Sequence, residues 1–388
     1  MNWLRRLTRR YLTTGGRILL GAAAASALAG LDPFRTQLGG LFVVIGSLAV
    51  ITFLLGLFTR PRLSGQWSAP VRAVAGGRFR LTVRVLNQGR RPAYDYETYL
   101  DHLPDGLSHG KEAPESRHDL LEPGHSHELR IPVWAWRRGA YDLGPVFVGS
   151  TYPLGLLRLG RKLAGQRRVL VTPPIHPIAQ LELASGLRYQ PGGVPLASQT
   201  GESMEFVGVR EYRHGDSLRK LHWKLWARRG QPVVREYSQE YFSRVGVILD
   251  TYRPGELEPA VEVAASIAAY LERRDAIVDF FAAGETVYTL SAGRHVGALQ
   301  SILDVLACVT ACKQPPYARL EAQLSRMLAG LSAVVVVTFA LNPERADFLE
   351  RLRVHGAPLK VIVVGSGECP PEAVRVNPKE MPECLQRL

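Results

Sequence analysis

The chain has 388 residues, of which 46% are hydrophobic and 21% are charged, a composition that excludes a largely disordered protein. Four cysteines are too few for a disulfide-stapled secreted scaffold. The net charge of +13 fits a nucleic-acid or membrane-surface protein, but residues 1–62 hold eight arginines against one acid, so more than half of the excess lies there. This location favours membrane anchoring over nucleic-acid binding, because basic residues flank membrane helices.

Two apolar segments lie in this N-terminal region. Residues 39–58 contain no charge, and about 20 helical residues span the ~30 Å of a bilayer core. Residues 18–31 are shorter and rich in alanine. We expect residues 1–62 to form a transmembrane helical hairpin, although a buried core helix is an alternative for the longer segment.

The arginines on both sides of the hairpin predict that both chain ends lie in the cytoplasm. The expected location is therefore the inner (cytoplasmic) membrane, multi-pass, with cytoplasmic soluble domains. If the first segment does not insert, the soluble part lies on the outside instead.

Two further domains are predicted. Residues 63–174 contain short stretches that alternate apolar and polar side chains, such as 79–85, separated by Gly and Pro; this pattern predicts a small β-sandwich. Residues 243–388 contain apolar runs at 245–249 and 334–337, and strand-like stretches with one charged residue each at 276–281 and 359–364, all of which alternate with helical periods. Such alternation predicts an α/β domain with a mostly parallel sheet.

Between these domains, residues 175–242 form a linking segment with a dense polar motif. Residues 201–240 hold eight Lys or Arg and six acids. This near balance favours ion pairs over a nucleic-acid patch. It also offers arginine and aromatic side chains, which are favoured anchors of protein interfaces.

The motif resembles the signature of the bacterial domain of unknown function 58 family. The matching residues are Arg210, Glu211, Tyr212, Gly215, Asp216, Arg219, His222, Trp223, Ala227, Arg228, Arg235 and Glu236. Arg138-Gly139, Leu143-Gly144-Pro145 and the run from Tyr152 to Leu156 also look like that family. The resemblance implies a membrane-anchored protein whose α/β domain is von Willebrand factor A-like. It implies two partners, a MoxR-type AAA+ ATPase and a transglutaminase-like membrane protein, besides the lipid bilayer.

Two functions remain open from the sequence. The first is a non-enzymatic, membrane-tethered scaffold that presents the α/β domain to a protein partner, with the motif as a structural or partner-binding element. The second is a hydrolase-type enzyme that uses Asp216, His222 and Asp250. Ser217 lies between Asp216 and His222 but lacks the strained turn of a serine nucleophile.

No cofactor or metal is predicted. Von Willebrand A domains often hold Mg²⁺ with an Asp-x-Ser-x-Ser motif after the first strand, and here Asp250 is followed by Tyr252 and Pro254 at the two serine positions. We therefore expect a degenerate, empty site at Asp250. Cys308, Cys312, Cys369 and Cys384 lack zinc-site spacing and are expected to be reduced thiols.

Overall fold

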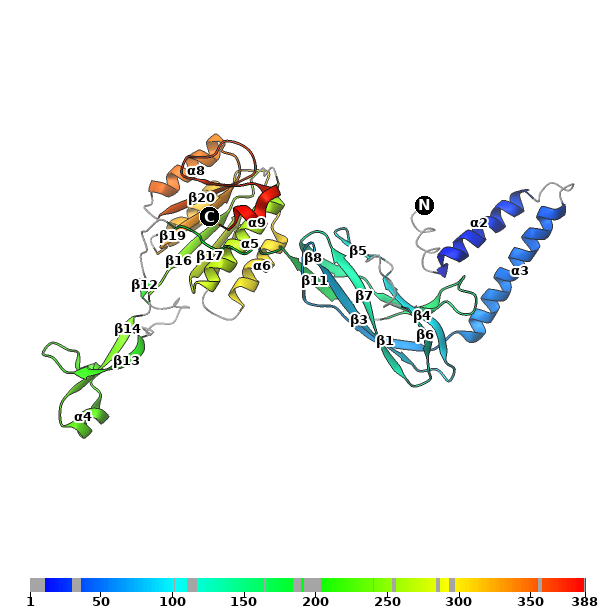
Figure 1. The fold of residues 1–388 in the computed structure, drawn as a ribbon, viewed down its shortest axis with the longest axis horizontal. Helices are drawn as coiled ribbons and strands as arrows, with labels where there is room; N and C mark the ends of the chain where they lie inside the picture. The colour runs from blue at the N-terminus through cyan, green and yellow to red at the C-terminus, as the bar shows by residue number, and fades with distance from the viewer. Residues whose placement is uncertain are drawn as a thin grey trace. The chain divides into compact units, whose positions relative to one another are not determined.

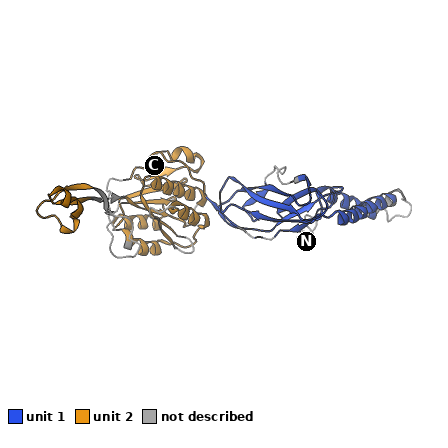
Figure 2. Cartoon of the chain, turned by 90° about the horizontal axis from the view of Figure 1, so that it is seen from below, with its two compact units in different colours: residues 1–172 blue, residues 173–388 orange. Residues whose placement is uncertain are grey.

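The computed structural model describes the whole chain except residues 1–10, 30–35, 101, 110–116, 164, 166, 184–189, 192–203, 240, 253–255, 284–286, 293–296, 329, 355–357 and 387. The chain forms two compact units, residues 1–172 and 173–388 (Figure 2). This division is coarser than the four segments expected from composition. The first unit holds two N-terminal helices and a β-rich region, and the second holds an α/β sheet with a projecting hairpin (Figure 1).

The N-terminal helices are α2 (Thr14–Ala29) and α3 (Thr36–Thr59), which pack against each other. Within the described residues, Gly40–Thr59 is the one segment long and apolar enough to cross a membrane. Only 11% of that segment is buried in the protein, which disfavours the core-helix alternative because a core helix is covered by its own domain. The structure therefore supports one possible membrane-spanning helix, and a second span through α2 stays a prediction.

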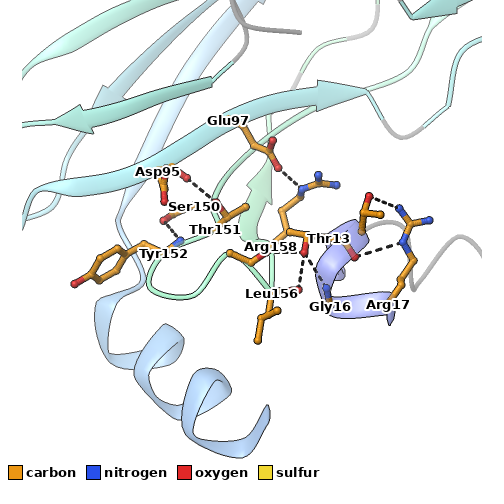
Figure 3. Close-up of polar contacts among 12 residues, drawn as sticks. Thr13, Gly16, Arg17, Asp95, Glu97, Ser150, Thr151, Tyr152, Leu156 and Arg158 are labelled. Carbon is orange, nitrogen blue, oxygen red and sulfur yellow. Dashed lines mark hydrogen bonds and ion pairs between the residues drawn. The ribbon is translucent and has the colours of Figure 1, made fainter. Parts of the chain in front are cut away.

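A loop of the β-rich region holds the start of α2 (Figure 3). The backbone N–H of Thr13 donates to the carbonyl oxygen of Leu156 at 3.1 Å, and that of Arg158 donates to Tyr11 at 2.8 Å. A Cβ on Gly16 would lie 2.1 Å from the Leu156 oxygen. Only glycine permits this approach, so α2 begins against Gly155 and Leu156, the end of the run noted in the sequence.

The same loop is fixed to the sheet behind it. Arg158 pairs with Glu97, and its guanidinium lies 4.5 Å from the ring centroid of Tyr99. The end of α3 is held nearby, since Arg91 donates to the carbonyl oxygen of Phe58 at 3.0 Å. Both helices are thus joined to the β-rich region by hydrogen bonds as well as by the chain itself.

The β-rich region contains three sheets with the orders β1-β3-β7-β5, β10-β9-β4-β6 and β2-β11-β8. Its strands are β1 (Leu63–Ser68), β2 (Arg72–Val74), β3 (Arg78–Asn87), β4 (Ala93–Leu100), β5 (Leu107–His109), β6 (Arg117–Leu121), β7 (Ser126–Ala135), β8 (Gly139–Leu143), β9 (Val146–Ser150), β10 (Leu159–Lys162) and β11 (Arg167–Thr172). Alternate residues of β3 and β7, such as Leu81 and Leu129, are buried. They meet residues of the other two sheets, including Tyr96 and Val169, in one core. The predicted β-rich region is confirmed.

The second unit is built on a six-stranded sheet with the order β18-β17-β16-β19-β20-β21. Its strands are β16 (Arg244–Leu249), β17 (Ile277–Ala283), β18 (Val287–Ala292), β19 (Ala333–Thr338), β20 (Leu359–Val364) and β21 (Val374–Val376). All neighbours are parallel except the β17–β18 pair. The predicted mostly parallel sheet is confirmed, whereas the sequence does not predict the edge strands β18 and β21, because they lack a strong apolar run.

Helices cover both faces of this sheet, as its continuous apolar strands require. The helices are α5 (Leu257–Arg273), α6 (Ala298–Cys308), α7 (Tyr317–Leu328), α8 (Pro343–Val354) and α9 (Met381–Cys384). One core contains α5, α6 and α9 residues and the other contains α7 and α8 residues. Ile178 and Leu181 join the first core, so part of the expected linking segment belongs to this unit.

Two short ribbons complete the unit. One pairs β12 (Gln190–Pro191) with β15 (Tyr241–Phe242). The other pairs β13 (Met204–Glu211) with β14 (Val233–Gln239), and between these strands lie the 3-10 helix η2 (Leu218–Lys220) and α4 (Trp223–Arg229). We call residues 204–239 the arm, because this ribbon projects away from the six-stranded sheet (Figure 1).

Candidate functional site

All twelve residues of the sequence motif lie on the arm. Arg210 and Glu211 end β13; Tyr212, Gly215 and Asp216 form the following turn; Arg219 lies in η2; His222 precedes α4; Trp223, Ala227 and Arg228 lie in α4; and Arg235 and Glu236 lie in β14. The motif therefore builds one local structure. A small core of Leu221, Val233 and Val234, each at most 4% exposed, holds that structure together.

An ion pair closes the turn at the end of β13. The two terminal nitrogens of Arg210 donate to the two carboxylate oxygens of Asp216 at 2.7 and 2.8 Å, and the backbone N–H of Arg213 donates to Asp216 at 2.8 Å. Gly215 has φ of +104°, in the region that favours glycine. Glu236 forms a second, longer ion pair, in which its Oε1 lies 3.8 Å from Nε of Arg210.

These contacts set the protonation of Asp216. The hydrogen bonds from Arg210 and from the Arg213 backbone lower the pKa of the Asp216 carboxyl to about 2. A carboxylate with such a pKa is ionised throughout the physiological range and is a weak base. A general base works best with a pKa near the operating pH, so this environment disfavours the catalytic role considered for Asp216.

His222 has a structural role at the start of α4. Its side-chain Nδ1 accepts a hydrogen bond from the backbone N–H of Leu225 at 3.3 Å. The backbone N–H of His222 donates to the carbonyl oxygen of Val233 at 2.8 Å. The side chain therefore caps the helix and the backbone ties it to β14. Among the described residues, no hydrogen bond or ion pair joins His222 to Asp216 or Asp250.

Asp250 lies elsewhere, after β16, in a buried network at the carboxyl edge of the sheet. One carboxylate oxygen accepts from Nε of Arg345 at 2.7 Å and from the hydroxyl of Thr338 at 2.8 Å. The other accepts from the backbone N–H of Tyr252 at 2.9 Å. The Tyr317 hydroxyl lies 3.4 Å away, and burial together with the Asp250 charge raises the pKa of Tyr317, so it stays protonated as a donor.

Arg345 supplies the positive charge that this buried carboxylate needs. The side chains of Arg345 and Asp250 are 7% and 4% exposed. The remaining guanidinium nitrogens donate to the carbonyl oxygens of Ala340, at 2.8 Å, and of Tyr252. A metal ion at Asp250 would have to displace this guanidinium. Sequence reasoning missed Arg345, because a buried arginine near a helix start has no pattern that separates it from exposed ones.

A cavity of about 600 Å³ opens beside Arg345. Phe339, Gly365, Ser366 and Lys379 are among its lining residues. Neither Asp216, His222 nor Asp250 is among the described residues that line it. The three residues of the enzyme hypothesis therefore do not converge in this pocket.

Comparisons with known proteins agree with the motif. Residues 208–368 match the family described as "Protein of unknown function DUF58", and this range includes all twelve motif residues and most of the sheet. The chain is also 26% identical over 364 residues to the "Uncharacterized protein YeaD" of Bacillus subtilis, which covers 91% of this chain and 89% of YeaD. The chain is thus similar to this family over the arm and the sheet, and YeaD is a distant relative over most of its length.

Similarity to solved structures is much weaker. Alpha-2-macroglobulin of Escherichia coli in its native conformation matches at 15% identity and a TM-score of 0.23, over 41% of this chain and 9% of that one. The CARDB domain of PF1109 from Pyrococcus furiosus matches at 12% identity and a TM-score of 0.18, over 29% of this chain and 96% of that domain. Matches this weak do not establish a shared fold.

The Arg210–Asp216 pair predicts a local, not a global, effect of substitution. The two side chains are 39% and 21% exposed, so the large cost expected for breaking a buried pair does not apply. We expect Asp216→Ala to leave the melting temperature of the full chain in detergent within about 2 °C of wild type. The matched control is Asp279→Ala, because Asp279 is 1% exposed and pairs with Arg244. That control should lower melting by on the order of 10 °C, and equal losses in both variants would contradict the assignment.

A second prediction concerns Asp250. Removing the guanidinium in Arg345→Ala leaves a buried carboxylate uncompensated, which costs roughly 3–5 kcal/mol. Melting of the α/β unit should then fall by on the order of 10 °C. Mg²⁺ at millimolar concentration should not shift the melting of wild type, because Arg345 already holds the carboxylate. Micromolar Mg²⁺ binding to wild type in a calorimetric titration would show this account to be wrong.

Proposed function

We propose that this chain is a non-enzymatic adaptor, tethered to a membrane, that offers its α/β unit and arm to a protein partner. The observation that carries the proposal is that the polar residues of the motif considered for catalysis make structural contacts within the arm. Asp216 and His222, the two candidates for chemistry on the arm, are engaged in building it. Trp223, by contrast, is 63% exposed, as expected for a contact residue.

The tether is the N-terminal hairpin. The apolar segment of α3 is long enough to cross a bilayer, and α2 packs against it. With both helices inserted, the flanking arginines place both chain ends in the cytoplasm. The protein is then a multi-pass protein of the inner membrane with cytoplasmic soluble units.

The partner suggested by the family resemblance is a MoxR-type AAA+ ATPase, with a transglutaminase-like membrane protein as a second associate. A von Willebrand factor A-like α/β unit is a fitting module for such an assembly. The buried Arg345–Asp250 pair supports a binding rather than a metal-dependent role for this unit, because the carboxylate that would hold a metal is already paired.

Membrane vesicles of defined orientation test the proposal. We expect the full chain to stay in the membrane after an alkaline carbonate wash. Inverted vesicles, which expose the cytoplasmic face, should bind the purified MoxR-type ATPase of the same cell saturably, whereas right-side-out vesicles should not. The matched control is vesicles prepared from cells without this chain.

Each part of the proposal has its own contradicting result. Release of the chain by the carbonate wash would show that the N-terminal hairpin does not anchor it in the membrane. Binding to right-side-out vesicles alone would reverse the orientation. If neither vesicle type binds the ATPase, with or without nucleotide, the MoxR-type ATPase is not the partner.

A further inference from the structure

The end of the arm concentrates positive charge. Residues 213–229, which we call the tip, contain six basic residues and one acid. The basic residues are Arg213, Arg219, Lys220, Lys224, Arg228 and Arg229, and all six are exposed. Residues 201–240 are nearly balanced in charge as a whole, but the tip within them is not.

The one acid of the tip is already occupied. Asp216 binds Arg210, which belongs to β13 and not to the tip. Within the described part of the chain, none of the six basic side chains of the tip forms an ion pair with an acid. The tip therefore presents its cations to the surroundings.

The remaining acids of the stretch do not cancel this charge. Glu236 faces Arg210, and Glu211, the last residue of β13, forms no ion pair with the tip among the described residues. Glu205 pairs in register with Ser238, six residues before the end of β13, which at ~3.3 Å per residue is about 20 Å from the tip. That distance exceeds twice the Debye length of about 8 Å at physiological salt.

Apolar side chains lie among these cations. Leu218 and Trp223 are 65% and 63% exposed. The ring of Trp223 stacks on that of Trp226 with centroids 5.3 Å apart, a contact that restricts its rotamers before any partner binds. An exposed tryptophan on a segment that also carries four exposed arginines has the composition of an interface hot spot.

We propose that the tip docks onto an acidic protein surface, with Trp223 and Leu218 entering an apolar depression in it. This inference rests on the adaptor function proposed above and names the chemistry of the partner's surface. Four of the six cations are arginines, whose planar guanidinium groups match carboxylates with two parallel hydrogen bonds. The partner should therefore carry clustered Asp and Glu side chains around the depression.

The geometry favours a protein over a lipid surface. A helix that lies in a membrane interface needs a long apolar face. Helix α4 has seven residues, about two turns at 3.6 residues per turn, and it presents one exposed tryptophan. Discrete anchors of this kind fit a pocket in a protein.

Site-specific photocrosslinking tests the inference. Trp223 is replaced by photoreactive benzoylphenylalanine in the full chain in its own membrane, and Leu218 is replaced in a second variant in case the first perturbs the tip. The matched control is Trp136, which is 62% exposed but lies in the β-rich region. Adducts are identified by mass spectrometry as peptide, lipid or nucleic acid.

We expect both tip positions to capture a peptide with an excess of Asp and Glu, and Trp136 not to capture it. The yield should fall at least fivefold in 0.5 M salt and in the Arg228→Gln/Arg229→Gln variant, because screening and loss of charge weaken the same contact. Adducts to phospholipid, nucleic acid or this chain itself would overturn the inference. So would a salt-insensitive adduct, or no adduct beyond the Trp136 level.

This experiment separates two failures. If the chain binds the MoxR-type ATPase but neither tip position gives an adduct, the adaptor function stands and the tip inference is wrong. If the tip captures an acidic surface of another protein, the tip inference stands and the named partner is wrong.

Discussion

The ion pair between Arg210 and Asp216 is the interaction on which the arm depends. It joins the last part of β13 to the turn that follows, and the Arg213 backbone shares the same carboxylate. A two-stranded ribbon is only marginally stable in water by itself, so a bidentate pair at its end has a large effect on local order. The pair also engages Asp216, the only acid of the tip, while the six basic residues of the tip stay exposed. One contact thus shapes the arm and occupies the acid that could otherwise pair with the basic residues of the tip.

The α/β unit also contains an arginine–aspartate ion pair, but there the two side chains are buried. Arg345 holds Asp250 at the carboxyl edge of the sheet and also binds two backbone carbonyl groups. That edge is where open α/β sheets place ligands. Here an internal guanidinium neutralises the edge and links the ends of β16 and β19 to α8.

The sequence predicts the elements that have a strong local pattern. The apolar runs of α3 and of β16, β17, β19 and β20 and the alternation in β3 identify these elements, because burial on one or both faces dictates side-chain spacing. It also locates the motif residues, but not what they do. The charges of residues 201–240 nearly cancel when the whole stretch is counted, whereas residues 213–229 within it hold six basic residues and one acid. Only the hairpin shows that this basic segment forms the end of the arm. Arg345 approaches Asp250 from 95 residues away, a contact that no local pattern encodes.

Arg210, Asp216 and His222 of the motif are architectural and hold the tip in one shape. Hydrogen–deuterium exchange of the full chain in detergent tests this claim directly, with the amides of β16 and β19 as an internal reference. The account predicts that amides within residues 213–229 are protected in wild type and exchange at least tenfold faster in Asp216→Ala, while the sheet amides do not change. Equal protection of the tip in both proteins would contradict it, since Asp216 would then be free for a direct role in chemistry or binding.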